Sequence, residues 1–268
     1  MTIQDIYQIL DDYAPFSQQE SYDNSGLLVG DPEQEVRTIL LTLDITIPVI
    51  EEAVQKHADL ILSHHPVIWN PLRSVSPAHP VWHLIRHGIG AICSHTCFDV
   101  ARCDEKEPHS LNDALGSRLR KTIPMQEQND PFVQLSGNRV LGKAADLLHP
   151  ADADDLALQL RNALGCNSLR YYRGSRADAI RRIAWCTGSG GDLIDDAIRI
   201  GADALITGDC KHSVWAEAQN RSFTLFDCGH FETEVIIIDE FRSILAQFAP
   251  DITVLDSEAG KKPFFLTI

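Results

Sequence analysis

Residues 60–66 read Leu-Ile-Leu-Ser-His-His-Pro, and the rest of the chain is organised around this stretch. Its apolar run predicts a buried β-strand, and Pro66 ends the strand because proline cannot continue the hydrogen-bond ladder. His64 and His65 therefore lie at the carboxyl end of a buried strand, where open α/β sheets place their ligands. Neutral imidazole is the commonest protein ligand for metals, so the pair indicates either a metal site or two surface histidines in a turn.

The composition limits the class of protein. The chain has 268 residues, of which 44% are hydrophobic, enough for the core of one large domain or two smaller ones. Its formal net charge of −15 argues against a protein that mainly coats nucleic acid, because phosphate binding needs clustered Lys and Arg. The seven cysteines lack Cys-x-x-Cys spacing, which favours reduced thiols over a disulfide framework. With no secretory leader and no apolar run long enough to span a bilayer, we expect a cytoplasmic protein with no membrane partner.

Strands and helices alternate around the histidine strand. Residues 38–44 predict a buried strand, and residues 47–57 predict a helix with its apolar residues on one face. Together with the histidine strand they form a strand–helix–strand unit, which implies a parallel pair and an α/β fold. Downstream, residues 81–88 predict a helix closed by Gly88, and residues 89–93 predict the next strand.

The same order of elements returns later in the chain. Residues 51–65 align with residues 195–209 at a constant offset, since 195 − 51 and 209 − 65 both equal 144. Residues 93–99 match residues 228–234 at an offset of 228 − 93 = 135. Two matches in the same order indicate internal duplication of an α/β unit.

The duplication suggests how the chain is divided. The first α/β half is expected over residues 1–123, which contain both histidines of the opening strand and the pair His95 and Asp99. The second half is expected over residues 179–268. Residues 124–178 carry few chemically suggestive side chains and are expected to form a connecting scaffold.

Each half presents a histidine followed four residues later by a carboxylate. The pairs are His95 with Asp99 and His230 with Glu234. If a helix begins near each histidine, positions i and i+4 lie on one helix face. We expect Glu234 to open the apolar helix that follows it, where the helix dipole would favour a carboxylate. A carboxylate there could also bridge two cations.

Imidazole and carboxylate ligands without an obligatory thiolate suit Zn, Fe, Mn, Co or Ni. Two such ions would share and ionise a water molecule, the usual apparatus of metal-assisted hydrolysis. Cys93, Cys97 and Cys228 lie near enough in sequence to be rival ligands, but the preferred interpretation is small buried apolar side chains. Asp209 and His212 follow the second copy's strand and could line the site or hydrogen-bond its ligands.

Six motifs follow one another along nearly the whole chain. They are Asp23-Asn24-x-Gly26-Leu27-x-x-Gly30, Ser63-His64-His65-Pro66, His95-Thr96-x-x-Asp99, Leu111-Asn112-Asp113-Ala114-Leu115, Thr207-Gly208-Asp209 and Gly229-His230-Phe231-x-Thr233-Glu234. In type and order they resemble the NIF-three-like family, whose members are often named GTP cyclohydrolase I type 2 or its homologue.

The resemblance implies two intertwined α/β halves and two divalent transition-metal ions per chain, facing the cavity of a toroidal homohexamer. It implies that His65, Asp99 and Glu234 hold one ion. It implies that His64, His230 and the shared Glu234 hold the other. His95 would lie near the ions without being one of the five ligands, which makes it the candidate proton-transfer group.

The first functional hypothesis is therefore a metal-dependent hydrolase of a nucleotide or another phosphorylated small molecule. The chain has no Walker-type phosphate loop, although the glycine-rich residues 188–191 could offer backbone N–H groups to a phosphate or form a tight turn. The alternatives are a non-catalytic metal-binding or metal-handling adaptor and a nucleic-acid-associated factor. The acidic charge disfavours the last of these.

Overall fold

The structure of the protein is a computed structural model, which describes the chain apart from residues 103–109, 128–129, 135–138 and 266–268. The chain forms two compact units. Unit 1 consists of Met1–Phe98 and Ile237–Phe265, and unit 2 is built on Asp99–Ile236. The chain thus leaves unit 1 and later returns to it, so the units are intertwined. The boundaries predicted at residues 123 and 178 divide the chain by its internal repeat, whereas the two units are defined by their compactness. The predicted boundaries therefore stay a prediction.

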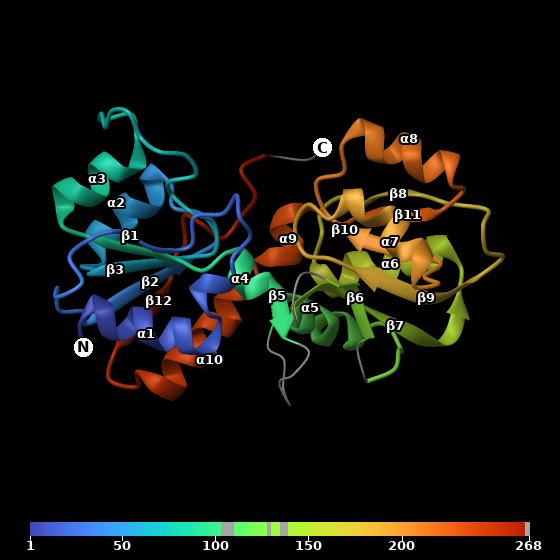
Figure 1. The fold of residues 1–268 in the computed structure, drawn as a ribbon, viewed down its shortest axis with the longest axis horizontal. Helices are drawn as coiled ribbons and strands as arrows, with labels where there is room; N and C mark the ends of the chain where they lie inside the picture. The colour runs from blue at the N-terminus through green and yellow to red at the C-terminus, as the bar shows by residue number, and fades with distance from the viewer. Residues whose placement is uncertain (103–109, 128–129, 135–138, 266–268) are drawn as a thin grey trace. The chain divides into compact units, whose positions relative to one another are not determined.

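Unit 1 contains a sheet with the strand order β1-β4-β3-β2-β12. Four of these strands, β1, β2, β3 and β12, are labelled in Figure 1. Its strands are β1 (Gly26–Val29), β2 (Thr38–Thr42), β3 (Leu60–Ser63), β4 (Gly90–Cys93) and β12 (Thr253–Asp256). Its helices are α1 (Ile3–Tyr13), α2 (Ile47–Gln55), α3 (Pro80–His87) and α10 (Ile237–Phe248), and the short α4 (Thr96–Asp99) ends at the first residue of unit 2. β2, β3 and β4 are parallel, as the strand–helix–strand pattern predicts. Gly88 ends α3 in the left-handed conformation.

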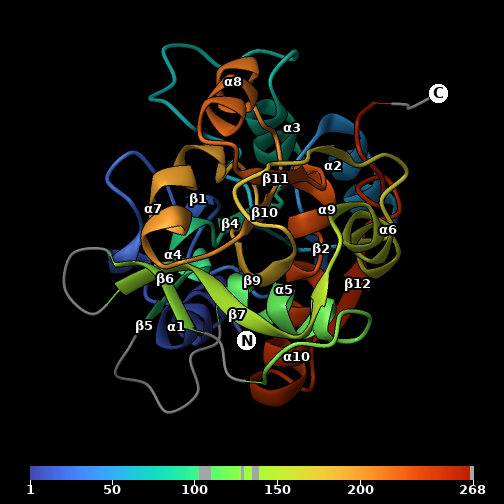
Figure 2. The same ribbon diagram turned by 90° about the vertical axis from the view of Figure 1, so that its right-hand side faces the viewer.

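Unit 2 contains a sheet with the strand order β5-β7-β9-β10-β11-β8. The long strand β7 also runs beside β6 (Figure 2). Its strands are β5 (Val100–Arg102), β6 (Asp130–Gln134), β7 (Arg139–Ala151), β8 (Arg170–Tyr172), β9 (Ile180–Trp185), β10 (Ala204–Thr207) and β11 (Thr224–Asp227). Its helices are α5 (Leu111–Arg120), α6 (Ala153–Leu164), α7 (Ile194–Arg199), α8 (His212–Asn220) and α9 (His230–Glu234). The strands β9, β10 and β11 are parallel.

The register of the strands confirms the duplication. The pairing of β2 with β3 joins residues 60 − 39 = 21 positions apart, and the pairing of β9 with β10 joins residues 204 − 183 = 21 positions apart. In unit 1, Asp59 Oδ2 accepts hydrogen bonds from two consecutive backbone N–H groups at the start of β2. In unit 2, Asp203 Oδ2 does the same at the start of β9, and 203 − 59 = 144. Both units therefore repeat one α/β plan.

The second sequence match differs from the sheet register by one residue. The last residues of β3 and β10 correspond at the offset of 144, and they pair with Cys93 and Asp227 respectively. The structural offset between β4 and β11 is therefore 227 − 93 = 134, whereas the sequence pattern gives 135. As a result His95 precedes the first residue of α4, whereas His230 is the first residue of α9. The two histidines share a sequence pattern but not a structural position.

The central strands of both units are buried along their whole length, since every residue of β3 and β10 is buried. Strands covered on both faces are continuous apolar runs, which explains why residues 60–62 show no polar alternation. The polar groups that follow β3 and β10 therefore lie at the carboxyl ends of buried strands. Among the described residues, no helix has the length and apolar character needed to cross a membrane.

Candidate metal centre

Three imidazoles gather at the carboxyl ends of two neighbouring strands in unit 1. His64 and His65 follow β3, and His95 follows β4. The centroid of the His64 ring lies 5.3 Å from that of His65 and 5.2 Å from that of His95, and the latter two are 5.5 Å apart. One potential ligand atom from each ring lies within 4.8 Å of the others. Pairing of β3 with β4 therefore creates a group that could hold a metal ion.

Each of these imidazoles directs its Nδ1 atom at an oxygen of the chain. The contacts are His64 to the Ser94 carbonyl at 2.8 Å, His65 to Asp44 Oδ1 at 2.8 Å and His95 to Asp23 Oδ1 at 2.9 Å. A carbonyl or an ionised carboxylate only accepts, so Nδ1 must carry the hydrogen. In the neutral ring the lone pair then lies on Nε2. This tautomer can act as a metal ligand or as a general base through Nε2.

Asp23 lies beside these imidazoles, although the sequence named it only within a motif and gave it no role at the site. Its side chain is fully buried and accepts hydrogen bonds from Ser25 Oγ and from the backbone N–H of Thr96. Burial alone would raise the pKa of the Asp23 carboxyl, but hydrogen bonds from His95, Thr96 and Ser25 hold it well below its usual range. Asp23 is therefore ionised and fixes the ring of His95. Asp44, which holds His65, was also not predicted.

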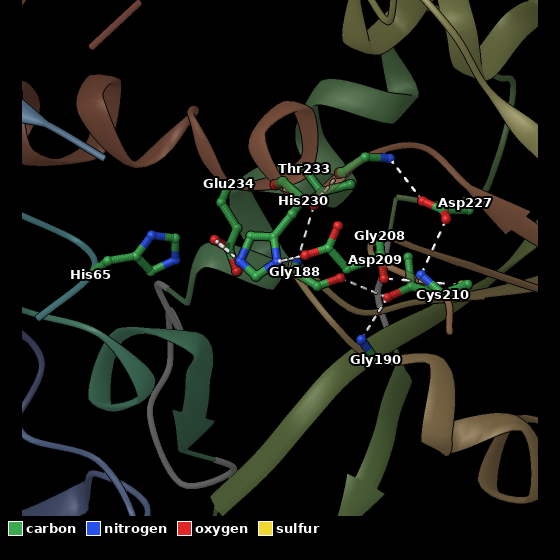
Figure 3. A network of polar contacts seen from close by, with 12 residues as sticks. His65, Gly188, Gly190, Gly208, Asp209, Cys210, Asp227, His230, Thr233 and Glu234 are labelled. Atoms are coloured by element: carbon green, nitrogen blue, oxygen red, sulfur yellow. Dashed lines mark hydrogen bonds and ion pairs between the residues drawn. The ribbon is translucent and has the colours of Figure 1, made fainter. Parts of the chain in front are cut away.

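His230 and Glu234 lie on one face of α9, as the i, i+4 spacing predicts (Figure 3). His230 Nε2 lies 2.8 Å from Glu234 Oε2, and His230 Nδ1 lies 2.9 Å from Asp209 Oδ2. The expectation that Asp209 would hydrogen-bond a site histidine is confirmed. Asp209 adopts a φ of 51°, which an aspartate tolerates better than most residues and which is frequent at functional sites. His212, by contrast, is exposed at the start of α8.

The expectation that Glu234 opens the long apolar helix is wrong. Glu234 is the last residue of α9, and the long helix α10 begins only at Ile237. The N-terminal dipole of α10 therefore does not explain the carboxylate. A break between two helices separates them, although the apolar pattern runs on through it.

The glycine-rich segment after β9 packs against the Glu234 carboxylate. A Cβ atom added to Gly188 would lie 2.0 Å from Glu234 Oε1 and 3.2 Å from His230 Nε2, so any larger residue there would displace the Glu234 carboxylate. The backbone N–H of Gly188 donates to Thr233 Oγ1, and that of Gly190 donates to Thr207 Oγ1 (Figure 3). These two N–H groups are therefore engaged within the fold. Of the two interpretations left open, phosphate binding loses these two donors, and the tight turn stays a prediction.

Asp99 is held in unit 2 by groups from α5 and the end of β9. Its carboxylate Oδ1 accepts a hydrogen bond from Thr187 Oγ1 at 3.2 Å. The fully buried Asn112 donates from Nδ2 to the Asp99 carbonyl at 3.1 Å and accepts from the Thr187 N–H at 3.0 Å. Asn112 thus ties the backbone of Asp99 to the turn that packs on Glu234.

The donors of unit 2 fit a metal ion by their charge. Asp99 and Glu234 are only 7% and 3% exposed, and one carboxylate oxygen of each lies within 4.8 Å of the other. Two buried carboxylates this close repel each other unless a cation or a proton compensates them. His230 adds to this repulsion. When its Nδ1–H donates to Asp209, the lone pair on Nε2 faces Glu234 Oε2, and this contact also needs a cation or a proton between the two atoms. The site residues of each unit are thus brought together within that unit.

The three cysteines weighed as rival ligands are buried, with at most 2% of their surface exposed. Within the described part of the chain, none belongs to a group that could hold a metal ion. A side-chain hydrogen bond shared with Cys166, together with burial, raises the pKa of the Cys228 thiol, so this thiol stays protonated. The interpretation of these cysteines as small apolar residues is confirmed.

Comparisons with known proteins identify the family of the chain. The model of the Duf34/NIF3 (NGG1p interacting factor 3) family matches residues 1–263. A Clostridium perfringens protein named GTP cyclohydrolase 1 type 2 homolog is 30% identical over 98% of this chain and 99% of its own length. A Campylobacter jejuni protein of the same name is 33% identical over 87% of this chain and 88% of its own length. The crystal structure of a Staphylococcus aureus hypothetical protein matches with a TM-score of 0.85 and 28% identity, covering 100% of this chain and 99% of that one. The predicted family is therefore confirmed, and the chain belongs to the Duf34/NIF3 family.

Proposed function

We propose that this chain binds two divalent transition-metal ions and hydrolyses a nucleotide or another phosphorylated small molecule. The observation that carries the proposal is the donor set of the two units. Unit 1 offers imidazoles whose Nδ1 atoms are engaged by oxygens, and unit 2 offers two close, buried carboxylates beside His230. The names of the relatives, which refer to a GTP cyclohydrolase, support a hydrolytic reaction on a nucleotide.

The proposed ligands are five residues. They are His64 and His65 of unit 1 with Asp99, His230 and Glu234 of unit 2. Glu234 would serve both ions, as the family resemblance implies. Mixed nitrogen and oxygen ligands suit Zn, Fe, Mn, Co or Ni, and among the described residues the buried cysteines belong to no group that could hold a metal ion. Each ligand histidine keeps an outer acceptor on Nδ1, which orients its ring.

When bound, the ions supply Lewis acidity and a water molecule that ionises near pH 7, so no protein nucleophile is required. The chain supplies proton transfer. Asp23 holds the Nδ1–H of His95, so Nε2 of His95 is free to accept a proton from water or to return it to the leaving group. The ionised Asp23 also stabilises the imidazolium that forms, and its own bonds to Ser25 and Thr96 keep this pair in one geometry.

The experiment is metal analysis of unstripped protein followed by a screen of nucleotides and phosphoesters with and without a chelator. We expect about two ions per chain. His95→Ala should cut turnover by roughly 10²–10⁴-fold and leave the metal content intact. His212→Ala is the matched control, since His212 is exposed and should leave both quantities unchanged. Glu234→Gln should lower the occupancy of both ions, whereas His64→Ala should mainly lower one.

Two results would contradict the proposal. Turnover that survives both chelation and Glu234→Gln would have to come from a contaminant. Bound metal without turnover of any compound, combined with ready exchange of the metal, would favour a non-catalytic metal-handling protein. We further propose a cytoplasmic homohexamer on the family resemblance alone.

A further inference from the structure

Trp69 lies beside the histidine cluster of unit 1. Its ring centroid is 5.2 Å from that of His95, with the two planes at 86°, and 6.4 Å from that of His65. The side chain is 49% exposed, whereas Trp185 in the core of unit 2 is fully buried. Single exposed apolar side chains are common on protein surfaces, so it is the ring contact with His95 that makes Trp69 a candidate for binding.

The position of Trp69 is coupled to that of His95. Asn24 Nδ2 donates to the carbonyl of Ile68, the residue before Trp69, at 2.7 Å. The backbone N–H of Asn24 donates to Asp23 Oδ1 at 2.7 Å, and the same oxygen accepts from His95. The adjacent residues Asp23 and Asn24 therefore hold both the proposed proton-transfer group, His95, and the backbone next to the exposed indole. The indole is a positioned surface rather than a side chain on an unattached loop.

We propose that Trp69 determines substrate specificity by stacking against a planar heterocyclic ring of the substrate next to His95. This inference rests on the proposed function and narrows it to ring-bearing substrates such as nucleotides. Base–aromatic stacking is available to every base because each has a π-face, and it excludes sugar phosphates that have no ring of this kind. The phosphate would still be attracted by the bound cations, so ring recognition and phosphate recognition fall to different groups.

The test compares two probes on the metal-loaded full chain by calorimetry: guanosine monophosphate, which carries a base, and ribose 5-phosphate, which does not. Trp69→Ala should weaken the nucleotide by about 5- to 150-fold and change the affinity for ribose 5-phosphate by less than about twofold. Trp69→Phe should retain most of the nucleotide affinity because it keeps a π-face. Trp82→Ala is the matched control, since Trp82 lies on α3 against the Arg86 guanidinium. Metal content and sedimentation should be unchanged in all three variants.

Several outcomes would overturn the inference. They are nucleotide affinity that is unchanged in Trp69→Ala, equal weakening of both probes, failure of the wild type to bind the nucleotide, and a change in oligomeric state that shows Trp69 to be an interface residue. The proposed function fails separately. A wild type that binds the nucleotide through Trp69 but turns over no compound would retain the stacking role and lose the hydrolase.

Discussion

Gly188→Ala should remove metal from the protein without unfolding it. The new Cβ would lie 2.0 Å from Glu234 Oε1 and 3.0 Å from Glu234 Cδ, distances that no relaxed structure retains. The obstructing atoms belong to the far end of a flexible side chain, so the carboxylate can rotate away while the backbone stays. The damage should therefore fall on the Glu234 carboxylate, which we propose as a ligand to both ions.

The magnitude has two parts. Gly188 has a φ of +60°, and an alanine in the left-handed region costs roughly 1–2 kcal/mol of stability. Gly165 supplies the control because it has a φ of +70° and nothing within 4 Å of an added Cβ. Gly165→Ala should lose about the same stability and keep its metal. Gly188→Ala should in addition weaken metal affinity by at least about 10–100-fold, the range seen when the partners of a metal ligand are disturbed.

The assay is urea denaturation of the metal-free forms together with metal titration of wild type and both variants. Equal losses of stability combined with a loss of metal affinity in Gly188→Ala alone would support the reasoning. Full metal affinity in Gly188→Ala would refute it, since the Glu234 carboxylate would then not be needed where the structure holds it. A much larger loss of stability than in the control would show that the backbone, rather than the carboxylate, had moved.

Three further predictions concern other parts of the chain. Asn112→Ala should destabilise unit 2 by about 1–3 kcal/mol and lower the occupancy of the ion that we propose Asp99 holds, with the exposed Asn220→Ala as the control. Unchanged metal content would show that Asn112 does not position Asp99. Burial alone would raise the pKa of Glu52, but hydrogen bonds from Lys56, Ser257 and two backbone N–H groups lower it to about 2 from 4.5. The ionised Glu52 therefore stabilises unit 1 fully above pH 4.5, and this stabilisation is lost as the pH falls towards 2. Glu52→Gln should remove up to about 3 kcal/mol of unfolding free energy at pH 6 and less at pH 3, and an equal loss at both pH values would contradict this reasoning. Sedimentation at micromolar concentration should show an oligomer, and a single species near 29.8 kDa would rule it out.

Local patterns in the sequence were sufficient to predict much of the fold. The apolar run before His64, the glycine that ends α3 and the repeat at an offset of 144 all appear as strands, caps and register in the structure. The strand and the cap could be predicted because an unbroken apolar run and a left-handed glycine each depend on neighbouring residues. The repeat could be predicted because duplicated units keep similar sequences. The spacing of His230 and Glu234 succeeded for the same reason, since helical periodicity is local.

Where α9 ends was not a local property. The apolar pattern runs from Val235 to Phe248 with neither proline nor glycine to interrupt it, yet Glu234 closes one helix and Ile237 opens another. Periodicity reports which face of a helix is buried, but it does not report that the chain passes at this point from one compact unit to the other. That passage is a tertiary event, and it decides where the carboxylate lies.

Apart from Asp209, the groups that orient the candidate site could be identified only from the tertiary structure. Asp23 is 72 residues from His95, Asn112 is 75 residues from Thr187, and Thr187 is 88 residues from Asp99. Each is an ordinary polar residue in its own segment, and nothing within that segment marks its partner. The sequence by itself determined the ligand types and the strand ends that carry them. Only the folded chain decided which carboxylate, amide or carbonyl meets each ligand, because these contacts form when strands distant in sequence pair side by side.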